Sequence, residues 1–319
     1  MKLVTMQRLS EEAVRNIVPE IELVQVAGEE ALLGASADAD IVIGSFGVAS
    51  GANFERLLQV AKRVRWIHTS RAGVDNLLTP EFLARDIILT CGKGYAAGRL
   101  LAEHAFALIL ARTRAVAVCA RLKTWGENAP LRKIVFELGG KTMGLVGFGG
   151  VGTALARRAI GFEMNVLAVK RTPSAQAIDG VAVWGMDRFD ELLARSDVVV
   201  VSVPLTSATK GMFGRSAFSK MKPGAILVNV GRGEVVDTAA LIDALREGRL
   251  GGAGLDVFEQ EPLPDDSPLW AMENVVITPH LSGASTERAA RNLETILENI
   301  RRFVEGRPLL SAVDTTTGY

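Results

Sequence analysis

One of the chain's three histidines stands where a parallel sheet presents its reactive groups. His280 follows Ile277-Thr-Pro279 at the carboxyl end of a predicted strand, the edge at which open α/β sheets bind ligands. An imidazole titrates near neutral pH and can therefore donate or accept a proton. His68 falls inside a predicted strand and His104 inside an apolar helix, so both are interpreted as packed or hydrogen-bonded residues. His280 is the predicted acid-base residue.

A carboxylate and a guanidinium follow the ends of two further predicted strands. A carboxylate on the far ring nitrogen would orient the imidazole and favour its charged form. Glu261 and Glu259 are both candidates, and their spacing alone does not choose between them. Arg232 lies between glycines that let the backbone bring it inward, where it could grip a carboxylate and polarise the adjacent carbonyl. Such a set suits hydride transfer to a 2-oxo acid, because negative charge then develops on oxygen.

The run Gly144-Leu-Val-Gly-Phe-Gly-Gly-Val-Gly152 predicts a strand, a tight turn and a helix. Within it, Gly147 would permit the turn, Gly149 would let the backbone approach a pyrophosphate, and Gly152 would let helix and strand pack closely. Amides at the helix N-terminus would face the phosphates. The predicted cofactor-binding residues here are Gly147, Gly149, Gly150, Val151 and Gly152.

Basic residues stand at the end of the next predicted strand. An Asp or Glu about 20 residues past the glycines would hold a ribose 2′-hydroxyl. This chain has Lys170, Arg171 and Thr172 there, and these side chains attract a 2′-phosphate. The hypothesis is that NADP(H) is preferred, with NAD(H) possible. The structural alternative is a solvated strand end.

Strand-like and helix-like segments alternate along the chain, which favours parallel βα units. The predicted strands are 2–6, 41–46, 65–69 and 87–91, then 142–147, 165–170, 198–203, 225–230, 254–258 and 275–278. The predicted helices are 54–63, 80–85, 100–114, 186–195, 215–221, 238–246 and 286–305. Six strands after residue 140 match a Rossmann-type doubly wound parallel sheet. We expect this domain, 101–285, to be inserted in a flavodoxin-like α/β substrate domain formed by 1–100 and 286–319.

Composition narrows the class of protein. The 319 residues are 48% hydrophobic, which supports large cores and more than one domain. Thirty-six basic and thirty-six acidic residues cancel, so neither nucleic acid nor a membrane surface is an expected partner. The first residues carry no apolar leader, and Cys91 and Cys119 provide neither a disulfide framework nor metal spacing. The chain is expected to be cytoplasmic and to hold no metal.

Taken together, the motifs resemble the D-isomer-specific 2-hydroxyacid dehydrogenase family over nearly the whole chain. Besides the glycine turn, the matching stretches are Val203-Pro-Leu-Thr206-Ser-Ala-Thr209, the run 229–237 (Asn-x-x-Arg-Gly-x-x-Val-Asp), Asp256-Val-Phe-x-x-Glu-Pro262 and 268–280, which ends in Thr-Pro-His280. In the first domain, Ser70-Arg-Ala-Gly-Val-Asp-Asn76 resembles the family's substrate loop. Departures are Ser202, where His is frequent, and Thr90-Cys91, where Asn-Thr is common.

The resemblance implies a role for each matching position. Arg232 would bind and polarise substrate, Glu261 rather than Glu259 would support the histidine, and His280 would be the acid-base residue. The implied cofactor contacts are Pro204, Thr209, Val230, Asp256 and Gly283, and the implied substrate contacts are Arg71, Ala72 and Gly73. A homodimer is also implied.

The leading hypothesis is NADPH-dependent reduction of a small 2-oxo acid, glyoxylate or hydroxypyruvate, to the D-2-hydroxy acid. Lys170 resembles the family's NADPH-using reductases at the usual acidic position. The alternative is a nucleotide-binding sensor related to corepressors, which would bind NAD(P)H without turnover. Formate oxidation is disfavoured, because Glu261 implies proton handling that it does not require.

Overall fold

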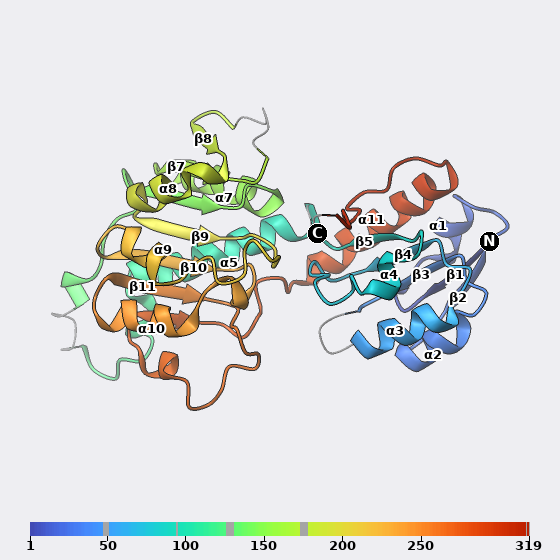
Figure 1. Ribbon diagram of the computed structural model, residues 1–319, viewed down its shortest axis with the longest axis horizontal. Coiled ribbons are helices and arrows are strands. Elements are labelled where there is room, and N and C mark those ends of the chain that lie inside the picture. Colours follow the sequence, from blue (N-terminus) through green and yellow to red (C-terminus); the bar gives the residue numbers. More distant parts are fainter. Residues whose placement is uncertain (47–50, 94, 126–130, 173–177, 317, 319) are drawn as a thin grey trace. The chain divides into compact units, whose positions relative to one another are not determined.

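The computed structural model describes residues 1–46, 51–93, 95–125, 131–172, 178–316 and 318. It divides into two compact units (Figure 1). Unit 1 comprises Met1–Ala97 and Ser285–Tyr319, and unit 2 comprises Gly98–Ala284. Each unit is described by itself below.

Unit 1 is built on a parallel sheet whose strands, among the described residues, are ordered β2-β1-β3-β4-β5. This is the flavodoxin-like order. The strands are β1 (Lys2–Thr5), β2 (Glu22–Gln25), β3 (Ile41–Gly44), β4 (Trp66–Thr69) and β5 (Ile88–Cys91). β3 and β4 are buried along their whole length, as continuous apolar runs covered on both faces require.

Helices cover both faces of this sheet, because side chains alternate along each strand. One face packs on α2 (Glu29–Ala35), α3 (Gly51–Val60) and α4 (Pro80–Leu83). The other packs on α1 (Glu11–Arg15) and α11 (Thr286–Val304). Ile296 and Ile300 of α11 lie in one cluster with Trp66 of β4, so the last helix completes the first unit. In Figure 1, α11 accordingly appears in red beside blue and teal strands.

Unit 2 contains, in the part of the chain that is described, a parallel sheet of order β12-β11-β10-β9-β6-β7-β8. Counted from β6, this is the doubly wound dinucleotide-fold order extended by one strand. The strands are β6 (Thr142–Val146), β7 (Asn165–Val169), β8 (Val181–Trp184), β9 (Val198–Val201), β10 (Ala225–Asn229), β11 (Leu250–Leu255) and β12 (Val275–Ile277).

Two helical layers sandwich the sheet of unit 2. One cluster joins α8 (Phe189–Arg195), α9 (Arg215–Lys220) and α10 (Thr238–Arg246) to one face. The second joins α5 (Tyr95–Thr113) and α7 (Gly150–Gly161) to the other. Short elements complete the chain, namely α6 (Val116–Cys119), η3 (Leu131–Lys133), η4 (Met186–Arg188), η5 (Gly233–Val235) and η6 (Pro268–Ala271). The Asp237 carboxylate caps α10 by accepting from Ala240 N at 2.9 Å.

Two strands were missed from the sequence, and both lie at sheet edges. β2 and β8 are half-exposed, with polar or small residues in Glu22-Leu-Val-Gln25 and Val181-Ala-Val-Trp184. An edge strand is covered on fewer sides than a central one, so its apolar signal is weak. The prediction of six strands in the second unit was therefore one too few.

The predicted starts of one helix and one strand were wrong because glycines lie inside these elements. α5 begins at Tyr95 rather than at residue 100, because Gly98 lies inside its first turns, where a Cβ would come within 2.6 Å of Gly150 O. β11 begins at Leu250 rather than at 254. There Arg112 of α5 donates to Gly251 O, and a Cβ on Gly252 would lie 2.4 Å from Arg112 Nε. In both places glycine permits close packing rather than a turn.

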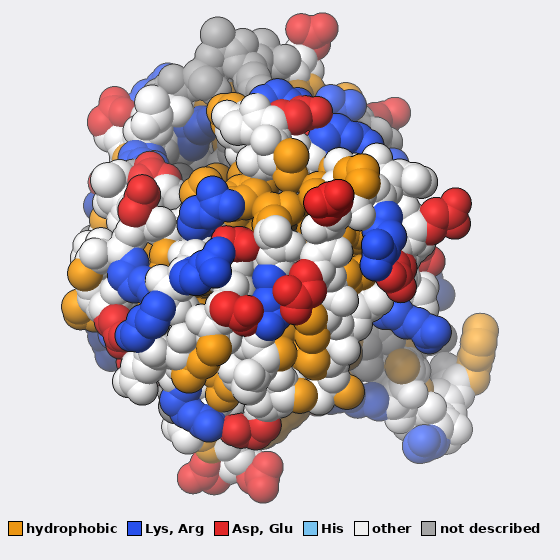
Figure 2. Space-filling view, turned by 90° about the vertical axis from the view of Figure 1, so that its right-hand side faces the viewer, with side chains coloured by type: hydrophobic (Ala, Val, Ile, Leu, Met, Phe, Trp, Pro, Cys, Tyr) orange, Lys and Arg blue, Asp and Glu red, His pale blue; other side chains and the backbone are white. Residues whose placement is uncertain are grey.

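Acidic and basic side chains are interspersed on the face of the molecule drawn in Figure 2. Within the described residues, no helix combines the length and the apolar character that a membrane crossing needs.

Candidate active site

The glycine turn joins β6 to α7 with the geometry that a pyrophosphate site requires. Gly147 has φ +102°, a conformation that favours glycine. A Cβ on Gly152 would lie 2.3 Å from Gly147 O, whereas a Cβ on Gly149 would meet nothing within 4 Å. Backbone at Gly149 therefore faces open space at the start of α7, together with Gly150 and Val151. The turn fits a dinucleotide phosphate at a helix N-terminus.

Ser202 secures this turn from the neighbouring strand end. Its Oγ donates to Gly147 O at 3.3 Å, and a Cβ on Gly147 would come within 3.1 Å of that same Oγ. A larger side chain at position 202 would have to point elsewhere. The departure from the family pattern noted at this position thus has a structural use.

Basic side chains follow β7 directly. Lys170 is half-buried, and its amide donates to Trp184 O of β8 at 3.0 Å, while Arg171 and Thr172 are exposed. All three follow the strand that pairs with β6, whose end carries the glycine turn. They therefore lie at the carboxyl edge of the sheet, where the adenosine end of a dinucleotide binds in this fold.

Further along this edge, Pro204 and Thr209 belong to one braced loop. Thr209 Oγ1 donates to Pro204 O at 2.7 Å and accepts from Thr206 N at 2.8 Å. Val230 is buried at the end of β10, where its amide donates to Val201 O. The Thr209 hydroxyl thus holds the loop, and its donor is already in use.

Asp256 is a buried hub at the end of β11. Its Oδ1 accepts from Thr278 Oγ1 at 2.6 Å and Leu281 N at 2.8 Å, and its Oδ2 accepts from Ser282 N at 2.9 Å. His104 Nε2 lies 2.8 Å from Thr278 Oγ1 and 3.3 Å from Asp256 Oδ1. Because the single hydroxyl proton of Thr278 goes to Asp256, His104 Nε2 must donate to Thr278.

These hydrogen bonds control the titration of Asp256. Burial alone would raise the pKa of this carboxyl, but hydrogen bonds from His104, Ser282 and Thr278 outweigh it and hold the pKa well below the usual range. Asp256 is therefore a fixed negative charge beneath the loop that carries His280 and Gly283.

His280 and Glu261 form a close pair beyond the ends of β12 and β11. His280 Nδ1 lies 2.7 Å from Glu261 Oε2, and Glu261 Oε1 accepts from Phe258 N at 3.0 Å. An ionised carboxylate only accepts, so Nδ1 carries a hydrogen and the contact with Glu261 leaves Nε2 unused. Glu259 instead accepts from Thr238 N at the start of α10. The two candidate carboxylates are thus separated by geometry.

The pair shifts both pKa values toward an ion pair. The hydrogen bond from Glu261 raises the pKa of His280; burial opposes this, and the charges of Glu261 and Asp256 add to it. Burial would raise the pKa of Glu261, but hydrogen bonds from His280 and Phe258 lower it overall. An imidazole whose pKa is raised stays protonated closer to neutral pH, as a proton donor needs.

Arg232 is held next to this pair by a loop after β10. The buried Asn229 side chain accepts from Gly231 N at 3.0 Å and donates to Arg232 O at 2.9 Å. A Cβ on Gly233 would overlap Phe258, so glycine is needed for this approach. The Arg232 charge is close enough to lower the pKa of Glu261 and to oppose the rise at His280.

The sequence of this region matches a known family domain. Residues 106–282, more than half of the chain, match the model of the D-isomer specific 2-hydroxyacid dehydrogenase, NAD binding domain. The chain belongs to this dehydrogenase family. The resemblance drawn from its motifs and the α/β fold class are thereby confirmed.

Two relatives illustrate the range of dehydrogenases to which the chain is similar. A D-3-phosphoglycerate dehydrogenase of Archaeoglobus fulgidus is 40% identical over 261 residues, 81% of this chain and 49% of the relative. The chain thus spans about half the length of that protein. A glyoxylate reductase of Pyrococcus furiosus is 39% identical over 259 residues, 79% of this chain and 76% of the relative.

A solved structure extends the likeness to the whole chain. It is an NADPH-dependent glyoxylate/hydroxypyruvate reductase from Sinorhizobium meliloti in complex with NADP and sulfate. At 27% identity its TM-score is 0.81, over 100% of this chain and 99% of that one. Such relatives support the reduction of 2-oxo acids by a 2-hydroxyacid dehydrogenase.

The predicted substrate loop of the dehydrogenase lies in unit 1, after β4. Arg71 is exposed, and its carbonyl accepts from Gly92 N at 2.8 Å, while Ala72 and Gly73 are half-buried. His68, two residues before Ser70, is buried with Nδ1 2.8 Å from Thr90 Oγ1, and burial lowers its pKa to about 4. His68 is thus a neutral packed residue, as interpreted from the sequence, and Thr90 is its partner.

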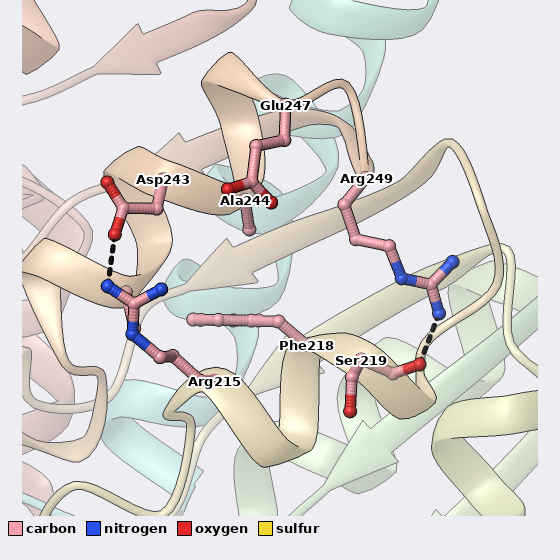
Figure 3. Close-up of a pocket in the computed structure, with 8 residues that line it drawn as sticks. Arg215, Phe218, Ser219, Asp243, Ala244, Glu247 and Arg249 are labelled. Atoms are coloured by element: carbon pink, nitrogen blue, oxygen red, sulfur yellow. Dashed lines mark hydrogen bonds and ion pairs between the residues drawn. The ribbon is translucent and has the colours of Figure 1, made fainter.

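A hollow elsewhere on unit 2 of the dehydrogenase has a different character (Figure 3). It measures about 160 Å³ and is lined by Arg215, Phe218, Ser219, Ala240, Asp243, Ala244, Glu247 and Arg249. Arg215 pairs with Asp243, and Arg249 donates to the carbonyls of Ser219 and Met221. These side chains join α9 to α10 and are not among the residues predicted to act on substrate.

Sequence reasoning missed Thr278 and also missed Arg288 and Asn292, the side chains of α11 that donate to Ser70 O. Thr278 was visible only as part of a motif, and its contact with His104 joins residues 174 positions apart. Arg288 and Asn292 precede Ile296 and Ile300 at four-residue spacing, on the stripe that α11 buries. The sequence signal that could have identified Arg288 is a charged residue on the otherwise apolar, buried side of a helix.

Proposed function

We propose that this dehydrogenase is an NADPH-dependent reductase of small 2-oxo acids, with glyoxylate and hydroxypyruvate as the best candidates, and that it forms the D-2-hydroxy acid. The observation that carries the proposal is the His280–Glu261 pair at 2.7 Å, with the Arg232 charge beside it. The glycine turn supports dinucleotide binding. A Cβ on Gly147 or Gly152 would meet neighbouring atoms, whereas a Cβ on Gly149 would meet none within 4 Å, so the backbone there has room for a ligand. Relatives named glyoxylate reductase support the substrate class.

Each side chain has one task in this scheme. The reduced nicotinamide, when bound, supplies the hydride to the carbonyl carbon. His280 donates the proton on Nε2 to the carbonyl oxygen, so that the C=O group becomes CH–OH, and Glu261 stabilises the charged imidazolium beforehand. Arg232 binds the substrate carboxylate and stabilises charge that develops on oxygen. In oxidation, the same imidazole accepts the proton.

For the cofactor, we propose that Lys170, Arg171 and Thr172 hold the 2′-phosphate of NADP(H). They follow β7, where a carboxylate would repel that group. The glycine turn would hold the pyrophosphate, and the ends of β9, β10 and β11, with Pro204, Val230 and Asp256, would line the nicotinamide half.

A panel of 2-oxo acids, each assayed with NADPH and NADH, tests the proposal. We expect kcat/KM to be highest with NADPH and with glyoxylate or hydroxypyruvate. Absence of turnover with every acid, despite tight NADPH binding, would favour a nucleotide sensor. A clear preference for NADH would refute the cofactor assignment alone.

We also propose a homodimer. Two large apolar side chains in the segment after α5 are exposed, Val116 to 55% and Trp125 to 91%. Such side chains are typical of interfaces. Analytical ultracentrifugation over a range of concentrations would measure the dimer directly.

A further inference from the structure

Arg288 of unit 1 contacts the Ser70 loop and lies within electrostatic reach of two further arginines. Arg71 belongs to the loop, and Arg288 and Arg291 lie one turn apart near the start of α11. Arg288 Nη2 and Asn292 Nδ2 both donate to Ser70 O, at 3.1 and 3.2 Å. A Cβ on Gly92 would lie 2.3 Å from the same carbonyl, so the strand end packs closely against the loop at Ser70 O.

Arg291 has two shielded donor atoms that its described neighbours leave without acceptors. Its Nε and Nη2 are shielded from solvent and meet no hydrogen-bond acceptor among the described residues. Glu287, four residues earlier, could have paired with it. Its carboxylate is held mainly by its own backbone amide and by the hydroxyls of Thr286 and Ser285, and the Arg291 charge contributes least. Buried charged donors without acceptors are costly, so such a group calls for a partner.

The neighbouring charges add to this cost. Burial lowers the pKa of the Arg288 guanidinium, and the nearby charges of Arg71 and Arg291 lower it further. Three like charges within electrostatic reach repel one another, and they lie near the positive end of the α11 helix dipole. The structure therefore concentrates positive charge at this point of unit 1.

We propose that Arg71, Arg288 and Arg291 form a binding site for a small oxyanion, a carboxylate or a phosphate. Planar guanidiniums match the two-oxygen geometry of both groups, and an anion would supply acceptors to Nε and Nη2 of Arg291. A neutral or cationic ligand would leave the repulsion in place. All three side chains of the site belong to unit 1, on α11 and on the Ser70 loop.

The oxyanion can come from two sources. It can be an acid group of the organic acid that the dehydrogenase reduces, in which case the site also contributes to substrate choice and rests on the proposed function. It can be a free anion such as inorganic phosphate, in which case it acts as an effector. Binding and kinetics separate these sources.

Thermal unfolding of the full chain tests binding without any turnover. Inorganic phosphate, titrated against chloride at constant ionic strength, should raise the Tm of the native protein. Arg291→Met should weaken phosphate binding at least tenfold. It should melt no lower than the native protein without phosphate, because it removes two shielded donor atoms that meet no acceptor in the described part of the chain. Arg301→Met is the matched control: it lies on the same helix, exposed and paired with Glu298, and should respond like the native protein.

A second variant, Arg71→Met, keeps the test valid if Arg291→Met does not fold. Arg71 is exposed, so Arg71→Met should fold normally and also weaken phosphate binding. An equal phosphate response in Arg291→Met and Arg301→Met, or no response in the native protein, would overturn the site. Since neither readout needs activity, failure of the proposed reductase function would leave this result standing.

Kinetics then identifies the source. If the site takes an acid group of the substrate, phosphate should compete with the 2-oxo acid, and Arg291→Met should raise KM for 2-oxoglutarate more than for glyoxylate. If it takes a free effector, phosphate should change kcat at saturating substrate in the native protein but not in Arg291→Met. Phosphate that changes neither parameter would contradict a functional site.

Discussion

The amide of His280 donates to the carbonyl of Asp256 at 2.9 Å, and the carboxylate of Asp256 accepts the amides of the next two residues, Leu281 and Ser282. His280 has φ +53°, which only a few non-glycine residues adopt. One buried aspartate thus holds the backbone on both sides of the histidine. The backbone position of the proposed acid thus depends on a side chain 24 residues earlier in the chain.

Thr278→Val tests this support. The substitution removes the hydroxyl that donates to Asp256 and accepts from His104, so buried Asp256 and half-buried His104 each lose one hydrogen bond. We expect a loss of about 1–3 kcal/mol in the free energy of unfolding and a lower kcat, because the His280 loop loosens. Urea titration and steady-state rates measure both. Thr278→Ser keeps the hydroxyl and should restore most of each quantity; equal losses in the two variants would argue against the hydrogen bond as the cause.

Glu261→Gln should change the pH dependence of reduction. Reduction needs protonated His280, so activity is lost as pH rises through its pKa. The hydrogen bond from Glu261 is the main cause that raises this pKa, so its loss should move the alkaline limb of kcat/KM to lower pH. Glu259→Gln is the control, because Glu259 contacts Thr238 and should leave the profile unchanged. A shift in the control alone would exchange the two roles.

His280→Gln should remove the proton donor while keeping a polar side chain of similar reach. We expect kcat to fall about 10²–10⁴-fold, the usual contribution of general acid-base catalysis. NADPH affinity, measured by fluorescence titration, should stay close to that of the native protein. Turnover that survives the change would mean that another group, or water, supplies the proton.

Lys170→Asp should reverse the cofactor preference. A carboxylate there repels a 2′-phosphate and can accept from a ribose 2′-hydroxyl. The ratio of kcat/KM for NADPH to that for NADH should drop at least tenfold, which corresponds to about 1.4 kcal/mol. Arg157→Asp makes the same charge change at an exposed position of α7 and should leave the ratio intact. If both variants lower the ratio equally, the effect comes from long-range charge and not from a contact between Lys170 and the 2′-phosphate.

His68 should make stability depend on pH. Its pKa is about 4 in the folded chain against 6.5 as the ordinary value. Between these values the unfolded chain binds the extra proton, so stability falls as pH drops from 7 toward 4, by roughly 3 kcal/mol in all. Urea unfolding at pH 7 and pH 5 should show this loss, and His68→Asn should flatten it. A native protein whose unfolding free energy is the same at both pH values would contradict the neutral, buried state.

The central strands and the closeness of His280 and Glu261 were predictable, because each leaves a local signature. Ile41-Val-Ile is apolar on both faces, and His280 and Glu261 follow strand ends that meet at one edge of the sheet. What local sequence could not resolve was the choice between Glu259 and Glu261. Glu259 and Glu261 are only two residues apart, so the choice depends on the direction in which each side chain points. In the structure, Glu261 lies 2.7 Å from His280.

Local sequence could not predict features that depend on contacts with distant parts of the chain. Gly98 and Gly252 read as breaks in local sequence, yet each admits a backbone or side chain from elsewhere in unit 2. The meaning of Arg291 likewise needs the fold, since only burial reveals that its donors lack acceptors. Long-range packing overrides local propensity at these sites.

Unit 1 is completed by a helix that is translated after the whole of unit 2. During synthesis the sheet face that carries Trp66 and Ile41 must wait for Ile296 and Ile300. At ~5–20 residues per second this delay lasts roughly ten to forty seconds. Through that interval the nascent chain should present an unfinished unit 1 whose apolar face chaperones can bind.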